Sequence, residues 1–377
     1  MSKPAELAID ADGHVLEPDD LWVREMPPSL RERAPRRAGS SRHVLVDQEL
    51  VPPRRTFANL EHRYQLMTDD ERVHNFADEG FTPRSLLDAL DVEGVTASVL
   101  FPSRGLVVVG AAGAGNDVVN AAARVYNDWI ADFCRAAPAR LFAAGMINPR
   151  DVPAAVDEAR RCVGELGCLA VFLRPNPVEG RNWHDPAYEP LWSVIEELGV
   201  PVCFHEGASV TLPQVATDRY DDHAFWHACT HPMEQQMAML SLVVGGVAER
   251  HPTLRFAHLE SGAGWLPYWA WRLDETIEAE HRAFPELTMK PSEYVQRQFF
   301  VSIDTDEAPG IAAIDLFRDP HVTWGSDYPH GDGKFPNALK TLAAIPGMTP
   351  TRFRSVVGDA PLRLFGRPLT DAVGRQT

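Results

Sequence analysis

Short, continuously apolar runs alternate along this chain with stretches of helical periodicity, and this alternation constrains the fold more than any other feature. Apolar runs of about four to eight residues, placed between helical stretches, indicate parallel strands that are buried on both faces. Eight such runs occur, at Leu7–Asp12, Val95–Phe101, Leu141–Ile147, Cys168–Leu173, Val200–His205, Leu254–Glu260, Phe299–Asp304 and Val322–Asp327. Helical periodicity is clear at Asn116–Ala136 and Asp185–Leu198 between them.

This order of elements predicts an α/β protein with a (β/α)8 TIM barrel. A doubly wound open sheet is the alternative, but no Gly-x-Gly-x-x-Gly turn follows the first strand. We expect one domain over residues 1–377.

Two connections are too long for plain crossovers, those between strands 1 and 2 and between strands 5 and 6. The first insertion spans about residues 18–85 and contains a hairpin pattern at 43–51 with a turn at Asp47-Gln48, then a helical pattern near 62–76. We expect this insertion to form a cap over the barrel mouth. The second insertion is predicted to be a long loop.

Charge and apolar content exclude several classes of protein. Fifty-three acidic against 36 basic residues leave a net charge of −17, which argues against nucleic acid and anionic membranes as partners. The apolar runs are shorter than the roughly 18 residues of a membrane span, and no signal peptide is recognisable, so we expect a cytoplasmic protein. Reduced core cysteines are expected at Cys134, Cys162, Cys168, Cys203 and Cys229.

Four predicted strands end in histidine and carboxylate residues, where a barrel of this kind carries its chemistry. Each residue alone has an ordinary structural interpretation, as a loop cap or a hydrogen-bonded core histidine. Together, on four strands of one polarity, they predict a metal site. The candidate ligands are Asp12, His14, Glu17, His205, Glu260, Asp327 and His330. Imidazole and carboxylate without thiolate suit iron, manganese or zinc.

Several segments resemble the amidohydrolase-related family, in the branch that includes aminocarboxymuconate semialdehyde decarboxylase. They are Asp10–Pro18, His184–Trp192, Phe204–Gly207, Leu259–Tyr268, Gly325–His330 and Val357–Phe365. The resemblance covers nearly the whole chain and implies a metal-dependent barrel. The family pattern places ligands at Asp12, His14, His205 and Asp327.

The chain departs from that pattern at two points. Asp12 stands where the pattern has histidine, which makes the ligand set more anionic. On the sixth strand His258 is followed two residues on by Glu260, and strand alternation predicts that both lie on one face, so either can serve as the acid–base group.

Lysine usage excludes one kind of dinuclear site. The only lysines are Lys3, Lys290, Lys334 and Lys340, so the predicted fourth strand has no lysine that could be carbamylated to bridge two metals. Seven candidate ligands nevertheless exceed the need of one ion. Either Glu17, Glu260 and His330 orient the other ligands, or they hold a second metal.

A finer resemblance concerns the Asp12-x-His14-x-x-Glu17 and Tyr328-Pro329-His330 variants. They are similar to a subgroup proposed to be dinuclear non-haem iron oxygenases, largely acting on coenzyme A-linked substrates. This favours a monooxygenase with two Fe per chain that hydroxylates a bulky organic acid or its CoA thioester, with His258 handling protons. The alternative is a mononuclear Zn- or Mn-dependent decarboxylase, hydratase or hydrolase of a carboxylated substrate, with His258 or Glu260 as acid–base group. A non-enzymatic binding barrel is the third class.

Further residues are candidates for substrate contact. Arg174 ends the fourth strand and either holds a substrate carboxylate or pairs with a site acid. Arg54 and Arg55, in a basic part of the cap, are expected to bind a substrate phosphate or carboxylate, and Trp265 to form an apolar wall. We also expect a homo-oligomer.

Three histidines at a spacing of four, His223, His227 and His231, are a weaker candidate. Thr230-His231-Pro232 is typical of a helix start and would break the shared face, so a structural role is favoured, with substrate contact next and metal binding last.

Overall fold

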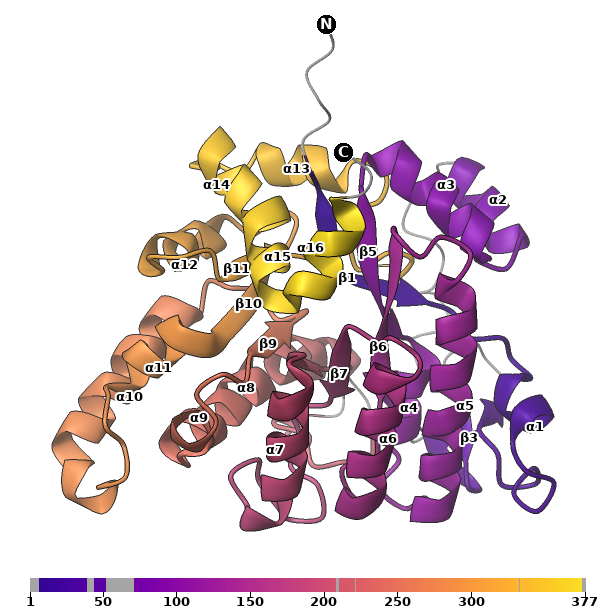
Figure 1. Cartoon of the computed structure of the whole chain (residues 1–377), viewed down its shortest axis with the longest axis horizontal. Coiled ribbons are helices and arrows are strands. Elements are labelled where there is room, and N and C mark those ends of the chain that lie inside the picture. Colours follow the sequence, from indigo (N-terminus) through magenta and orange to yellow (C-terminus); the bar gives the residue numbers. More distant parts are fainter. Residues whose placement is uncertain are drawn as a thin grey trace, which may run out of the picture.

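Eight parallel strands form a barrel in the order β1-β5-β6-β7-β8-β9-β10-β11 (Figure 1). The computed structural model describes residues 7–38, 44–51, 71–207, 210–220, 222–331 and 333–374. The strands are β1 (Ile9–Val15), β5 (Ala97–Pro102), β6 (Leu141–Met146), β7 (Ala170–Leu173), β8 (Val202–His205), β9 (Phe256–Leu259), β10 (Phe299–Ile303) and β11 (Val322–Trp324). Every residue in them is buried, as continuous apolar runs predict.

The barrel closes between its first and last strands through backbone hydrogen bonds. Asp327 N donates to Asp12 O at 3.0 Å, and His14 N donates to Tyr328 O at 2.8 Å. The predicted (β/α)8 barrel is therefore confirmed.

Helices follow the strands and cover the outside of the barrel (Figure 1). Their bounds are α1 (Leu21–Glu25), α2 (Glu71–Asp78), α3 (Pro83–Glu93), α4 (Arg104–Val109), α5 (Asn116–Cys134), α6 (Val152–Gly164), α7 (Glu189–Leu198), α8 (His223–Val244), α9 (Val247–Arg250), α10 (Leu266–Glu280), α11 (Pro291–Gln298), α12 (Ile311–Leu316), α13 (Ala338–Ala343), α14 (Pro350–Arg354), α15 (Ala360–Phe365) and α16 (Arg367–Val373). The two helices predicted from periodicity match α5 and α7. Gly199 ends α7 with a left-handed φ of 68°.

The prediction that a helix starts at Thr230-His231-Pro232 is wrong, because α8 runs through Pro232 without a break. A proline inside a helix removes one backbone hydrogen bond. Here burial offsets that cost, since Met239 and Leu242, in the following turns of α8, are fully buried apolar residues. His227 and His231 consequently share one helix face.

The predicted hairpin of the first insertion is confirmed. β2 (Arg36–Arg37), β3 (Val44–Val46) and β4 (Glu49–Val51) form an antiparallel sheet, with a turn at Asp47 and Gln48 whose φ values are 51° and 70°. Arg33 connects this sheet to α5 through ion pairs of 2.6 Å with both Asp47 and Asp117. Residues 52–70 lie outside the described part of the chain, so closure of the mouth by a cap stays a prediction.

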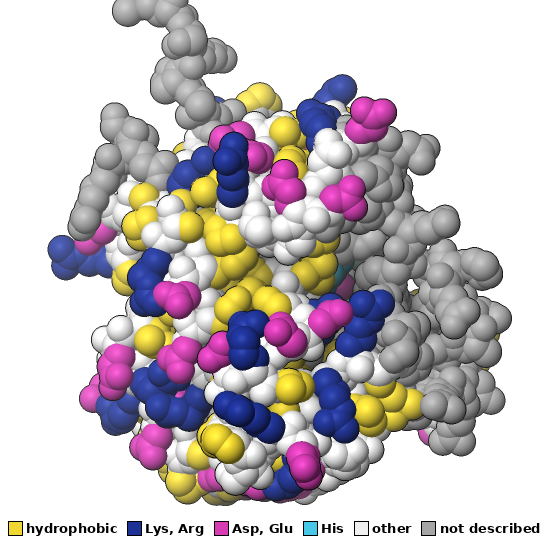
Figure 2. Space-filling model, turned by 90° about the vertical axis from the view of Figure 1, so that its right-hand side faces the viewer, with side chains coloured by type: hydrophobic (Ala, Val, Ile, Leu, Met, Phe, Trp, Pro, Cys, Tyr) yellow, Lys and Arg dark blue, Asp and Glu magenta, His cyan; other side chains and the backbone are white. Residues whose placement is uncertain are grey.

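The surface in Figure 2 carries acidic and basic side chains interspersed with apolar ones, so opposite charges lie close together on this face. All five cysteines are free, as predicted, and four of them are buried, whereas Cys229 is only partly buried and does not lie in the core as expected. Among the described residues, no helix is both long and apolar enough to cross a membrane.

Candidate metal centre

β1 brings Asp12 and His14 to the carboxyl end of the barrel. Its register against β5 shifts between Asp10 and Gly13, which marks a β-bulge at the point where side chains must be re-aimed. Asp10 holds this bend in place, because its carboxylate accepts hydrogen bonds from Ser98 Oγ at 3.0 Å and Ser326 Oγ at 2.7 Å. Both Asp12 and His14 are almost fully buried.

The rings of His14 and His205 are nearly perpendicular, at an interplanar angle of 83°, and their Nε2 atoms lie 3.0 Å apart. His14 Nδ1 lies 3.0 Å from Pro102 O, and His205 Nδ1 lies 2.7 Å from Glu206 O. A carbonyl oxygen can only accept, so each Nδ1 carries a proton and each Nε2 is the ring nitrogen that faces into the site. Two imidazole nitrogens this close can share a proton or bind one metal ion, and Nδ1 hydrogen bonds to backbone carbonyls are the usual support of metal-ligating histidines.

Carboxylates surround these two nitrogens. Asp12 Oδ1 lies 3.2 Å from His205 Nε2 and is buried without a well-directed hydrogen bond. Although burial opposes a charge on His205, Asp12 and Glu260 raise its pKa to about 9. Burial, then His330 and His205, lowers the pKa of His14. The pocket therefore stabilises positive charge at His205, which is what a ligand set for a cation does.

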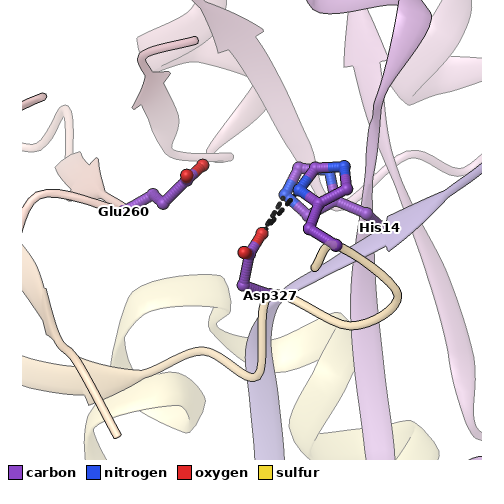
Figure 3. Close-up of side chains that lie close together, drawn as sticks. His14, Glu260 and Asp327 are labelled. Atoms are coloured by element: carbon purple, nitrogen blue, oxygen red, sulfur yellow. Dashed lines mark hydrogen bonds and ion pairs between the residues drawn. The ribbon is translucent and has the colours of Figure 1, made fainter. Parts of the chain in front are cut away.

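Asp327 completes the group from the segment after β11, with a left-handed φ of 54°. Its Oδ1 lies 3.4 Å from His14 Nε2 and 2.7 Å from His330 Nδ1. His330 Nε2 in turn lies 2.8 Å from Ser103 Oγ. Figure 3 shows the carboxylates of Asp327 and Glu260 on two sides of the space that His14 faces. One donor atom each from His14, Glu260, Asp327 and His330 lies within 4.8 Å of the others, and the same holds for Asp12, His14 and His205.

The expectation that His258 and Glu260 share one strand face is wrong. β9 ends at Leu259, and Glu260 has a left-handed φ of 48°, which turns its Oε2 to within 3.2 Å of His205 Nε2. His258 points instead into the helix layer, where its Nδ1 lies 2.6 Å from Gln235 Oε1 on α8 and its ring stacks between Phe204 and Phe299. Burial lowers the pKa of His258 to about 3. The predicted acid–base role of His258 has no support in this geometry.

Glu17, predicted as a metal ligand, binds backbone amides instead. Its carboxylate accepts the backbone N–H groups of Arg104 at 2.8 Å and Gly105 at 2.9 Å, at the first turn of α4. Orphan amides at a helix start are strong partners for a carboxylate. Glu17 thus positions the loop that carries Ser103, outside the groups that can hold a metal among the described residues.

Arg174 is buried and forms an ion pair of 2.7 Å with Glu206, which is the second of the two roles left open by the sequence. Trp265 donates its indole N–H to Ser261 O at 3.2 Å and lies against the ring of His258, so it packs at the helix layer. Its expected contact with substrate stays a prediction. Arg54 and Arg55 lie outside the described residues.

A cavity of about 370 Å³ opens beside the metal centre. The lining includes His227, His231, Glu260, Asp304, Asp306 and Asp327. His227 and His231 were only a weak sequence candidate, because a helix break was expected between them. The sequence analysis did not select Asp304 as a site residue. Asp304 directly follows β10, and its position at the carboxyl end of a barrel strand could have identified it, as it did Asp12, His205 and Asp327.

The protein is a (β/α)8 barrel, and the residues clustered at the carboxyl end of the barrel are those of a metal-binding site. The family model described as Amidohydrolase (Amidohydro_2) matches residues 9–367. The chain therefore belongs to the amidohydrolase family, as its motifs predict.

Two curated relatives are decarboxylases. The 2-amino-3-carboxymuconate-6-semialdehyde decarboxylase of Dictyostelium discoideum is 28% identical over 65% of this chain and 66% of its own length. The gamma-resorcylate decarboxylase of a Rhizobium species is 31% identical over 54% of this chain and 62% of its own length. Each alignment thus spans somewhat less than two thirds of the relative.

Solved structures share the fold. An amidohydrolase of Mycobacterium avium subsp. paratuberculosis superposes with a TM-score of 0.76 at 20% identity, over 97% of this chain and 100% of the other. A 5-carboxyvanillate decarboxylase of Novosphingobium aromaticivorans, complexed with manganese and 4-hydroxy-3-methoxy-5-nitrobenzoic acid, gives a TM-score of 0.68 at 16% identity, over 95% and 96% of the two chains.

The expectation of an oxidoreductase is corrected by these relatives. The monooxygenase interpretation depended on a resemblance through a few residues around Asp12 and His330. The longer matches are to enzymes that remove carbon dioxide, a reaction in which the substrate is neither oxidised nor reduced by a cofactor.

Proposed function

We propose that this chain is a metal-dependent decarboxylase of a small carboxylic acid, the reaction favoured among the lyase alternatives. The observation that supports it best is the cluster of the buried residues Asp12, His14 and His205 with the half-buried Asp327 beside them, in a chain that has decarboxylases among its curated relatives. Such a cluster has the ligand chemistry of zinc or manganese and needs no redox-active ion.

Asp12, His14, His205 and Asp327 would hold the ion. When bound there, a divalent cation supplies Lewis acidity toward carboxylate or phenolate oxygens of a substrate. Manganese in the 5-carboxyvanillate decarboxylase supports this choice of metal. The backbone carbonyls of Pro102 and Glu206 keep both imidazoles in the tautomer that ligation requires.

The reaction also needs a proton. The bond between the substrate carbon and its carboxylate breaks, the electron pair stays on that carbon, and a proton must be added there as carbon dioxide leaves. Asp304 lines the cavity and is exposed there, so it can reach a bound substrate. Desolvation, then Glu307, raises its pKa to about 7. It can therefore hold a proton near neutral pH, and we assign it as the donor.

The size of the cavity sets the substrate class. At about 370 Å³ it suits one small ring or a short unsaturated acid, near the lower end of the range for ligand pockets. An adenine nucleotide carrier is much larger than this, so a coenzyme A group would have to lie outside the cavity.

The test is release of carbon dioxide by the full chain, loaded with Mn²⁺ or Zn²⁺, from 2,6-dihydroxybenzoate, 5-carboxyvanillate and related small acids. We expect release from at least one acid, abolished in Asp327→Asn. Asp304→Asn should keep its metal and lose about 100-fold or more in kcat, as loss of a general acid does. An oxygen-dependent hydroxylated product, or fully metal-loaded protein that decarboxylates none of these acids, would refute the proposal.

A further inference from the structure

We propose that the barrel mouth contains a second divalent-cation site, formed by His227, His231 and Glu260 beside the metal centre. The inference adds to the proposed function and depends on it only in assigning the first ion to His14 and His205 as ligands. It differs from the second-metal alternative drawn from the sequence, because Glu17, one ligand of that alternative, is held by the backbone amides of α4.

The helix α8 supplies two of the three ligands. His227 and His231 are four residues apart on one continuous helix, and their ring centroids lie 4.3 Å apart. Histidines at this spacing project from the same face and can bind one metal ion. His231 Nε2 lies 3.4 Å from Glu260 Oε1, and one donor atom from each of the three residues lies within 4.8 Å of the others.

Glu260 connects this group to the metal centre. Its Oε1 faces His231, whereas its Oε2 lies 3.2 Å from His205 Nε2. A carboxylate whose two oxygens face two histidine groups has the geometry of a bridging ligand. The left-handed φ of 48° that produces this orientation is unfavourable for glutamate, and such strain concentrates at functional sites.

The charge of the cavity supplies a reason for a second cation. Glu260, Asp304, Asp306 and Asp327 line it, while Lys334, the one lysine of its described lining, pairs with Asp306 at 3.1 Å. Carboxylates at this density repel an anionic substrate, and one metal ion offsets only part of that charge. A second ion would offset more and would present open coordination positions to a second oxygen of the substrate.

Two imidazoles and one carboxylate with open positions favour zinc, with manganese as the weaker ligand match. The substrate class follows from this arrangement. An acid with a carboxylate and a neighbouring hydroxyl or second carboxylate offers two oxygens to two ions.

The test is metal stoichiometry of the untagged full-length chain. The protein is stripped with a chelator, equilibrated with excess Zn²⁺, freed of unbound ion, and measured by elemental analysis. We expect two zinc ions per chain in the native protein and one in His227→Ala/His231→Ala. His184→Ala, which removes an exposed histidine elsewhere, is the matched control and should keep two.

One zinc per native chain would overturn the proposal without any variant, and so would two ions retained by the double variant. Carbon dioxide release is measured separately on the same samples. Two ions without decarboxylation would refute the proposed function and leave the second site standing, whereas decarboxylation with one ion would do the reverse.

Discussion

The Nε2 atoms of His14 and His205 lie 3.0 Å apart at the carboxyl end of the barrel, and both rings donate their Nδ1 protons to backbone carbonyls. A metal ion held by both Nε2 atoms would take the place of the proton that they share without it. Because the unfolded chain has no such site, metal binding is linked to folding.

We therefore predict that removing metal lowers the stability of the folded chain. Free metal at about 100 times its Kd should add about 2.7 kcal/mol to the free energy of unfolding. Unfolding by denaturant with and without added Zn²⁺ measures this difference. His205→Ala should lose the metal-dependent part, and equal curves for the native chain with and without metal would contradict the assignment.

Substitution of Glu260 and substitution of His258 should have different effects on the amount of metal that the protein binds. Glu260→Ala is expected to lose bound metal because its carboxylate reaches His205 and His231. His258→Ala should keep its metal but lose about 2–4 kcal/mol of stability, since it leaves a cavity between Phe204 and Phe299. Elemental analysis and denaturant unfolding of both variants distinguish the two roles, and metal loss confined to His258→Ala would reverse them.

Arg174 is predicted to act in folding through its buried pair with Glu206. Arg174→Met leaves Glu206 charged, buried and unpaired, which costs about 3–5 kcal/mol. The double variant Arg174→Met/Glu206→Leu should regain part of that loss. If Arg174 instead holds substrate, the single variant will raise KM with little change in unfolding.

Glu234 should make stability depend on pH. Burial, then Glu206, raises its pKa from 4.5 to about 7, so the folded chain binds more protons than the unfolded chain between these values. Stability therefore falls as pH rises through that window, by an amount on the order of 3 kcal/mol at most. Glu234→Gln, which keeps an oxygen for Val215 N–H, should unfold at a higher temperature than the native chain at pH 8 and at a similar one at pH 5. Parallel Tm profiles of the two proteins would rule this out.

Much of the fold and part of the site could be predicted from the sequence. Apolar runs identify parallel strands because burial on both faces excludes polar alternation, and strand polarity then places Asp12, His14, His205 and Asp327 at one end of the barrel. The turn at Asp47-Gln48 and the end of α7 at Gly199 could also be predicted, since each depends on the backbone preferences of the residues at that position.

Contacts between residues far apart in the sequence determined the other features of the site. Glu260 enters the site because its backbone leaves the strand geometry, where its N–H is held by Ser302 Oγ at 3.0 Å, and no periodicity encodes that turn. Glu17 is taken up by amides of α4, 87 and 88 residues away in sequence. α8 passes through Pro232 because packing against the barrel outweighs a lost hydrogen bond, and only this continuity brings His227 and His231 together. The strand and helix patterns of the sequence determined which residues can be metal ligands in this protein, and tertiary packing determined which of those residues face one another.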